Sequence, residues 1–231
     1  MVKQPTPGVN TTGTAYSQTL GRGLRVLELL RAHPDGLGVH AVAERLDLHR
    51  TVVYRLLGTL RAHGLVMQGE GGRYRLGAGL LALAGGVRAD LRAAAEPRLG
   101  ALAEKVGATA FLTLAEGDEA VNACAVEPRH ARLHVGYRVG VRHALTVSAA
   151  GLAILAARPP VAGERAAVTR ARARGYAVTS GELEPGAWGL AAPLPAAGVA
   201  ASVGVVALTE LAEAGVARAV LDTARAIATD L

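Results

Sequence analysis

Several residue types and segments are scarce in this chain of 231 residues, and each scarcity excludes a class of structure or site. The single cysteine, Cys124, excludes an internal disulfide framework and a cysteine-based zinc site. No continuous apolar run is long enough to indicate a membrane-spanning helix. Phe111 and Trp188 are each the only residue of their type, although 51% of the residues are hydrophobic. The chain can therefore bury cores, but with very few large rings.

The N-terminus also lacks the apolar core of a signal peptide. Residues 1–16 are rich in small and polar residues and contain two prolines, which predicts a disordered leader. The simplest location for the protein is then the cytoplasm.

Positive charge is concentrated near the start of the chain. The net charge is +6, and Lys3 and Lys105 are the only lysines. Residues 17–77 carry nine arginines and five acids, a balance of +4, whereas 97–231 carry thirteen basic and twelve acidic residues, a balance of +1. Guanidinium groups bind phosphates and guanine edges in a bidentate manner, so this excess hints at a nucleic-acid partner.

Three short helices are predicted in the N-terminal region. Apolar residues fall on one face over 19–32, with Leu20, Leu24, Leu27 and Leu30, and again over 39–46, with Ala43 and Leu46. A third helix over 50–63 should bury the four residues Val53, Leu56, Leu57 and Leu60. Gly64 follows it at the position where glycine closes a helix.

The third helix resembles a recognition helix in its residue pattern. Its N-terminal half carries the polar residues that a helix-turn-helix pushes into the major groove, namely His49, Arg50, Thr51, Tyr54 and Arg55. Residues 65–68 and 73–76 alternate around the glycine-rich 69–72, which predicts a β-hairpin. This hairpin would be a wing, with Arg73 on the neighbouring DNA backbone.

Other functions also fit parts of this pattern. A short helix, a turn and a longer helix with exposed arginines occur in domains that never meet DNA, and each polar side chain can simply be solvated surface. A second alternative is a module that binds protein instead of DNA. The three arginines at positions 50, 55 and 73 argue against it. The hairpin and the local charge excess favour DNA.

Four stretches in the first 77 residues carry a specific resemblance. They are 21–30 (GRGLRVLELL), 43–46 (AERL), 51–57 (TVVYRLL) and 72–77 (GRYRLG). Their order and spacing resemble the IclR family of bacterial regulators. The resemblance implies a winged helix that binds palindromic double-stranded operators as a homodimer or as a dimer of dimers (a homotetramer). Arg22, in the first stretch, joins the predicted DNA-binding residues.

The chain after residue 77 is predicted to form a linker helix over 78–96 and a second domain over 97–231. We expect in this domain helices over 97–106, 147–157 and 211–229, and strands over 109–115, 120–126, 133–139, 188–194 and 201–208. Helices flanking a mainly antiparallel sheet make an α+β fold. The order of elements resembles the GAF-like effector-binding domain of the same family, most closely at 174–178 and 182–186.

The resemblance also implies an effector pocket between the sheet and the segment near 146–151. Carried over by position, its residues are Ser148, Ala149, Ala150, Thr179, Ala187, Gly189, Gly204 and Val206. Relatives that bind small carboxylates tend to have hydroxyl, acid or thiol groups at several of these positions. Gly189, Gly204 and Val206 depart from that pattern, and the segment after Pro160 looks shortened. We expect an apolar or aromatic effector, or a pocket that has lost its ligand.

Sites for other chemistry are weak in this sequence. His130, His134 and His143 lack the carboxylate spacing that would complete a zinc set. Cys124 lies mid-strand between two alanines, typical of a buried thiol and not of a nucleophile. No glycine-rich stretch matches a phosphate-binding loop. The sequence therefore predicts no cofactor and no metal, and an enzyme acting through the second domain is the weaker alternative.

Overall fold

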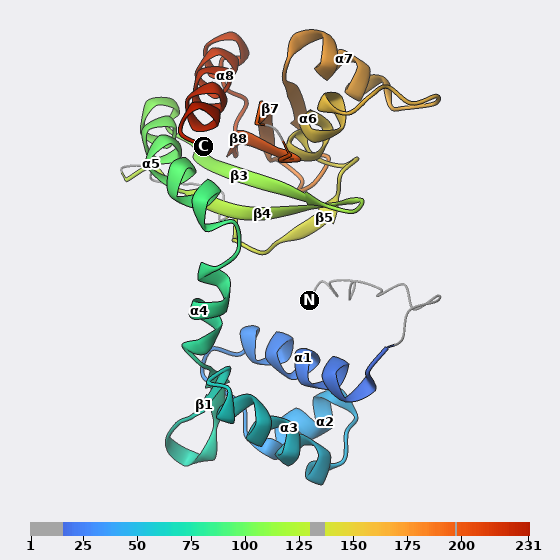
Figure 1. Ribbon diagram of the computed structural model, residues 1–231, viewed down its shortest axis with the longest axis vertical. Coiled ribbons are helices and arrows are strands. Elements are labelled where there is room, and N and C mark those ends of the chain that lie inside the picture. Colours follow the sequence, from blue (N-terminus) through green and yellow to red (C-terminus); the bar gives the residue numbers. More distant parts are fainter. Residues whose placement is uncertain (1–15, 130–136, 197) are drawn as a thin grey trace. The chain divides into compact units, whose positions relative to one another are not determined.

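The computed structural model describes residues 16–129, 137–196 and 198–231 (Figure 1). The chain forms two compact units, Met1–Val87 and Arg88–Leu231. Apart from Tyr16, the predicted disordered leader lies outside the described residues. Among the helices that the structure describes, none is both long and apolar enough to cross a bilayer.

The first unit is a winged helix-turn-helix, coloured blue to green in Figure 1. Its helices are α1 (Gln18–Arg31), α2 (Val39–Leu46) and α3 (Arg50–Ala62). They are followed by strands β1 (Val66–Gln68) and β2 (Tyr74–Leu76), which pair antiparallel around the 3-10 turn η1 (Glu70–Gly72). Helix α4 (Gly79–Gly85) completes the unit.

The apolar spacing of α3 produces the core of this unit. Its four predicted core residues, Val53, Leu56, Leu57 and Leu60, are all buried, and they pack with Val26, Leu30 and Val42. On α1 the prediction was partly wrong, because Leu20 and Leu24 are 64% and 51% exposed. The side of α1 that carries Val26 and Leu30 packs into the core instead.

Three glycines join the end of α3 to the start of α4. Gly64 closes α3 with φ +68°, in the left-handed region that favours glycine. The N–H of Gly79 donates to the Gly64 carbonyl over 3.0 Å, and the N–H of Gly77 donates to the Leu65 carbonyl over 2.8 Å. A Cβ atom at Gly77 would lie 2.2 Å from the Gly64 oxygen, so only glycine permits this approach.

The second unit is an α+β domain built on a six-stranded antiparallel sheet, as expected for the fold class. The strand order is β5-β4-β3-β8-β7-β6. The strands are β3 (Thr109–Glu116), β4 (Glu119–Val126), β5 (Arg142–Ala144), β6 (Ala177–Ser180), β7 (Trp188–Pro193) and β8 (Ala201–Ala207). The helices are α5 (Ala89–Val106), α6 (Ala149–Ala157), α7 (Ala166–Arg174) and α8 (Glu213–Thr229).

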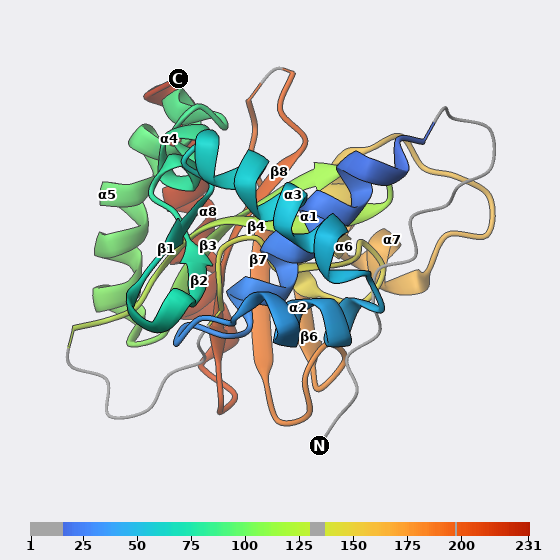
Figure 2. The ribbon, with the colours of Figure 1, turned by 90° about the horizontal axis from the view of Figure 1, so that it is seen from below.

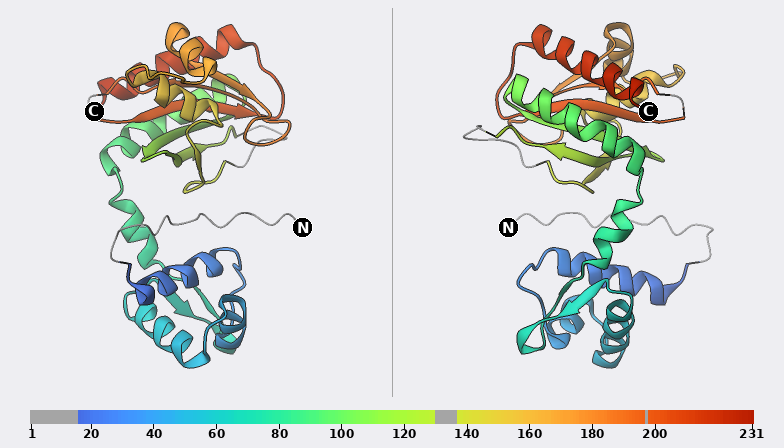
Figure 3. Two further views of the ribbon diagram at one scale, coloured as in Figure 1. Left: turned by 90° about the vertical axis from the view of Figure 1, so that its right-hand side faces the viewer. Right: turned by 60° about the vertical axis from the view of Figure 1, so that its left-hand side comes forward.

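Helices cover both faces of this sheet. Figure 2 shows α5 and α8 on one side of the strands and α6 and α7 on the other, and Figure 3 shows α5 beside α8. Alternate residues of the central strands face each layer, so Leu112 and Val203 pack toward α5 and α8. Phe111 and Ala191 pack toward α6 and α7. The sheet is therefore buried on both faces, and the second face carries the pocket described below.

The two helices expected over 78–96 and 97–106 do not meet at Pro97. The chain breaks earlier, where α4 ends at Gly85 and Arg88 adopts a left-handed conformation with φ 45°. Helix α5 then continues through Pro97, because Leu91, Ala95 and Leu99 are fully buried on both sides of it. This burial offsets the roughly 3 kcal/mol that an internal proline costs a helix. The predicted linker over 78–96 is thus divided between two helices and two units.

Two further differences concern irregular segments. The segment after Pro160, which looks shortened in the sequence, contains the helix α7. This helix buries only Val168 and Ala171 and is otherwise rich in arginine and alanine, so its apolar periodicity is weak. The strand expected over 133–139 falls mainly outside the described residues, and 137–139 are not strand. The edge strand β5 lies later, at Arg142–Ala144.

Candidate nucleic-acid interface and ligand pocket

The turn between α2 and α3 sets the first residues of the recognition helix. Asp47 adopts a left-handed conformation with φ 52°, which turns the chain sharply after α2. His49 caps α3, since its Nδ1 accepts the N–H of Thr51 over 3.3 Å. An Nδ1 that accepts leaves the proton of the neutral ring on Nε2, so His49 presents a donor outward.

The outer face of α3 is polar and accessible. Arg50, Thr51, Tyr54 and Arg55 are all exposed, and Tyr54 is 66% exposed although it is aromatic. The opposite face forms the core. A helix held by one buried face and presenting arginine, hydroxyl and phenol groups on the other has the donors that contact base edges and phosphates.

The wing is attached to the rest of the unit by two arginines. Arg73 donates from Nη1 to the Gly36 carbonyl over 3.2 Å, so the predicted DNA contact also holds β2 against the turn after α1. Arg61, near the end of α3, donates to Oε1 of Gln68 on β1 over 3.0 Å. Arg75 lies opposite Met67 in the hairpin and both are exposed. The sequence analysis did not single out Arg61 or Arg75, although alternation along β2 places Arg75 outward.

Arg22 comes from a different element than the other predicted DNA contacts. It lies half-buried on α1, between the two buried glycines Gly21 and Gly23. Within 16–87, none of the nine arginines forms an ion pair with a carboxylate of the described chain. Their positive charge is therefore available to an external anion.

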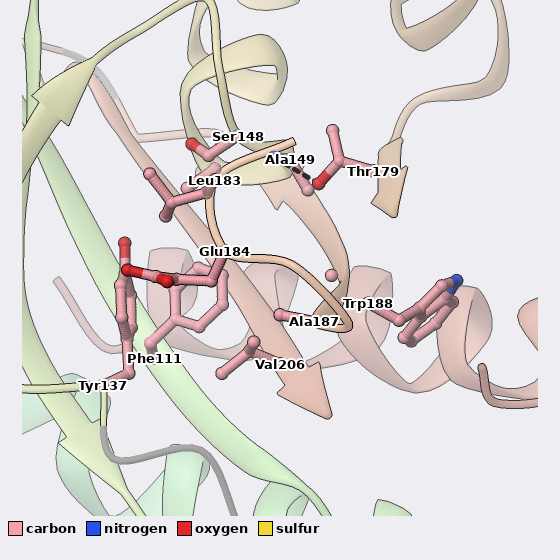
Figure 4. A pocket seen from close by; sticks show the side chains of 12 residues that line it. Phe111, Tyr137, Ser148, Ala149, Thr179, Leu183, Glu184, Ala187, Trp188 and Val206 are labelled. Carbon is pink, nitrogen blue, oxygen red and sulfur yellow. Dashed lines mark hydrogen bonds between the residues drawn. The ribbon is translucent and has the colours of Figure 1, made fainter. Parts of the chain in front are cut away.

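A pocket lies in the second unit where α6 begins above the sheet (Figure 4). Its walls come from α6, the loop between β6 and β7, and strands β3, β6, β7 and β8, and its volume is about 60 Å³. The lining residues are Phe111, Tyr137, Ser148, Ala149, Ala150, Thr179, Leu183, Glu184, Ala187, Trp188, Gly189 and Val206. The surface of the pocket is mainly apolar.

Two buried hydroxyls hold the first turn of α6. Ser148 caps the helix, its Oγ accepting the N–H of Gly151 over 3.0 Å. Thr179 on β6 accepts the N–H of Ala149 over 3.1 Å. Gly151 permits this arrangement, because a Cβ there would lie 2.1 Å from the Leu145 carbonyl oxygen. Each hydroxyl uses a lone pair in these bonds and keeps a proton that it can donate.

The aromatic side of the pocket depends on Gly204, whose lack of a side chain leaves room for the ring of Phe111. Phe111 lies directly opposite Gly204 across β3 and β8, and a Cβ at Gly204 would be 2.5 Å from its Cζ atom. The ring of Tyr137 packs edge-on against Phe111, with centroids 5.0 Å apart and planes at 66°. An aromatic ring therefore covers the sheet at the place where Gly204 was expected to face a ligand.

The polar end of Tyr137 contacts a second titratable group. Its hydroxyl lies 2.9 Å from Nε2 of His143. Burial raises the pKa of Tyr137 to about 12, and a hydrogen bond with Thr113 acts in the opposite direction. Burial also lowers the pKa of His143, opposed by the Ala144 carbonyl and Glu119. Both groups are uncharged at neutral pH, so this pair adds no charge to the pocket.

Seven of the eight expected effector residues line the pocket, and Gly204 does not. Five lining residues were not predicted, namely Phe111, Tyr137, Leu183, Glu184 and Trp188. Phe111 and Trp188 are unique in the chain, and that rarity was the one sequence signal available for them. Leu183 and Glu184 lie in the family-like stretch 182–186, but nothing in that stretch indicates that it folds over the pocket.

The histidines and the cysteine considered as metal ligands or as a nucleophile form no such site in the part of the chain described. No group of three His, Cys, Asp or Glu side chains there could hold a metal ion, and His130 and His134 lie outside the described residues. Cys124 is buried, and burial raises the pKa of its thiol, which disfavours the reactive thiolate.

Comparison with known proteins agrees with both units. The IclR helix-turn-helix domain matches residues 19–70, and the C-terminal domain of the bacterial transcriptional regulator IclR matches residues 86–167. The chain is 35% identical over 154 residues to the HTH-type transcriptional regulator Rv1719 of Mycobacterium tuberculosis, covering 66% of this chain and 59% of that protein. It is 29% identical to the regulator TtgV of Pseudomonas putida, covering 62% of this chain and 55% of that protein. The match thus spans less than two thirds of the length of each relative.

Solved structures extend the similarity to nearly the whole chain. An IclR homologue from Microbacterium hydrocarbonoxydans, complexed with 4-hydroxybenzoate, has a TM-score of 0.78 at 26% identity and covers 92% of this chain and 98% of its own. Pseudomonas aeruginosa HmgR has a TM-score of 0.75 at 25% identity, with coverage of 93% and 99%. The two IclR domain matches and these structures together show that the chain belongs to the IclR family.

Proposed function

We propose that the protein is a sequence-specific DNA-binding transcriptional regulator whose operator binding is modulated by a small molecule in the second unit. The observation that carries this function is the exposed polar face of α3, with Arg50, Thr51, Tyr54 and Arg55, beside a wing. It lies within the segment that matches the IclR helix-turn-helix domain. Such a regulator acts where bacterial DNA is, in the cytoplasm.

Each recognition helix would bind one half-site in the major groove. His49 and the exposed residues of α3 contact bases and nearby phosphates, while Arg22 and the wing contact the backbone. A palindromic operator needs two such helices related by a two-fold axis. Helix α4 and the turn after it support a homodimer. Leu81, Leu83 and Val87 are 76%, 64% and 53% exposed there, and a second copy would bury them. A dimer of dimers would bind a longer operator in the same manner.

The pocket would hold an apolar or aromatic effector. Its lining is mainly apolar, and a relative of the same fold is complexed with the aromatic compound 4-hydroxybenzoate. The effector shifts the population of DNA-competent dimers only by its differential affinity for their conformations.

The experiment that tests this function measures fluorescence anisotropy of DNA fragments taken from upstream of the protein's own coding region. We expect sequence-selective binding that weakens as salt rises, with a slope that counts the phosphate contacts. Absence of binding to specific and random DNA at low salt would overturn the proposal. Operator binding that never responds to pocket ligands would leave a regulator without an effector.

A further inference from the structure

The pocket is the size of one ring. At roughly 10–15 Å³ of accessible space per water molecule, its volume of about 60 Å³ holds about five waters. A single substituted benzene ring displaces about that number, since a water occupies about 30 Å³ of liquid. The paired rings of Phe111 and Tyr137 form one wall. An aromatic ligand can therefore stack or pack edge-on against this wall.

The buried polar groups of the pocket offer protons. Ser148 and Thr179 are 5% and 8% exposed, and both already accept a backbone N–H of α6. What they can still give a ligand is an O–H donor. The start of α6 adds the partial positive charge of a helix N-terminus, equivalent to about half an elementary charge. These groups match the partial negative charge of a carbonyl, ether or similar acceptor atom.

The only full charge in the described lining is negative. Glu184, on the loop between β6 and β7, extends toward Tyr137 in Figure 4. Arg165 is near this loop but is already engaged, since its Nη2 donates to Glu182 over 2.9 Å and its Nη1 donates to the Thr146 carbonyl. A carboxylate ligand would meet the like charge of Glu184, which is itself exposed to solvent, and only about half a charge of opposite sign from α6. A buried anion needs a better partner than this.

We propose that this pocket selects uncharged single-ring aromatic compounds that carry a hydrogen-bond acceptor, and that Glu184 excludes their carboxylate analogues. This inference rests on the proposed effector role of the pocket and specifies its ligand. It separates this chain from the relative complexed with 4-hydroxybenzoate, because that ligand carries a carboxyl group.

The test compares two ligands of nearly equal shape on the full-length protein. Acetophenone and benzoate both place a carbonyl on one ring, but the first ends in a methyl group and the second in a negatively charged oxygen. Isothermal titration calorimetry at neutral pH should show acetophenone binding, with benzoate weaker by about tenfold or more because of like-charge repulsion. A two-ring ketone, 2-acetonaphthone, should bind more weakly than acetophenone.

Two variants assign the selection to one carboxylate. Glu184→Gln should strengthen benzoate binding and leave acetophenone nearly unchanged, so the ratio of their affinities falls several-fold. Glu210→Gln is the control, because it removes one negative charge from the second unit at an exposed residue outside the lining and leaves the Arg165–Glu182 pair intact. It should leave the ratio unchanged.

Three results would overturn the inference. They are benzoate binding as tightly as acetophenone, binding of neither ring, and an equal change of the ratio in both variants. Anisotropy on operator DNA with the same protein separates this failure from failure of the proposed function. Retained DNA binding without ring selection refutes only the ligand class, whereas absent DNA binding refutes the regulator.

Discussion

The two units use arginine in opposite ways. In the second unit, seven arginines between Arg98 and Arg225 pair with carboxylates of the same unit, as in Arg98–Asp230 at 2.9 Å and Arg174–Glu213 at 3.3 Å. In the described part of the first unit, no arginine has such a partner. Net charge alone would not distinguish a nucleic-acid surface from a neutralised one. Ion pairing does distinguish the two kinds of surface. Only guanidinium groups without a carboxylate partner can replace the counterions of DNA without first breaking an internal ion pair.

The strongest test of this comparison removes two unpaired arginines from α3. The double variant Arg50→Ala/Arg55→Ala should lose operator affinity by about 100-fold or more, since a good arginine contact contributes about 1–3 kcal/mol. Anisotropy titrations should also show a shallower salt dependence. Arg174→Ala, which breaks an exposed ion pair in the second unit, is the control and should keep operator affinity. Equal losses in both would contradict the comparison.

The next largest effect should come from removing the least exposed of these ion pairs, Arg172–Glu164. Arg172 pairs with Glu164 and also donates to the carbonyls of Ala156, Leu155 and Arg158 at the end of α6. Arg172→Ala removes a donor from each of those carbonyls and should lower the melting temperature by about 5 °C. Arg225→Ala, which removes an exposed pair within α8, should change it by less than about 1 °C. Calorimetric melting measures both, and similar shifts would show that the pairs are equivalent.

The wing provides a smaller contrast within the first unit. Arg75→Ala should weaken operator binding about threefold to tenfold and reduce the salt slope by about one, as expected for one lost phosphate contact. Arg73 is partly engaged with the Gly36 carbonyl. Arg73→Ala should therefore lower the melting temperature of the first unit as well as the affinity. If Arg73→Ala changed only the salt slope, its bond to Gly36 would have no structural role.

The smallest effect concerns acid stability. Hydrogen bonds from Arg172 lower the pKa of Glu164 to about 2, well below its usual value of 4.5. The unfolded chain binds this proton more readily, so the stabilisation is complete above the usual value and is lost as the pH falls toward 2. Acid titration followed by Trp188 fluorescence should show a larger stability loss between pH 5 and 2 in the native protein than in Glu164→Gln. Asp222→Asn, at an exposed pair, should behave like the native protein.

The DNA-binding surface could be predicted because its information is local in the sequence. The spacing of Val53, Leu57 and Leu60 fixes the buried face of α3, and the polar residues then face outward without further information. The same reasoning failed for Leu20 and Leu24, because the side of α1 that carries Val26 and Leu30 enters the core instead. Apolar spacing identifies a helix, but where apolar residues lie on more than one side it does not show which side is buried.

The pocket could be predicted only in outline. Ser148 and Thr179 were placed by family resemblance, whereas Phe111 enters through strand register, as the partner of Gly204. Glu184 reaches the pocket from a loop whose path depends on the sheet and α6 together. Register and loop path are tertiary properties, so the charge and the aromatic wall of the site were not visible in a single sequence.

The glycine joint between α3 and α4 has a mechanical consequence. Gly64, Gly77 and Gly79 bring backbone against backbone, with no flexible side chain between them to absorb a displacement. We therefore expect α4 and the recognition helix α3 to move together as one rigid body. A rotation of α4 would then change the orientation of α3. Replacing one of these glycines with a bulkier residue would weaken this coupling between the two helices.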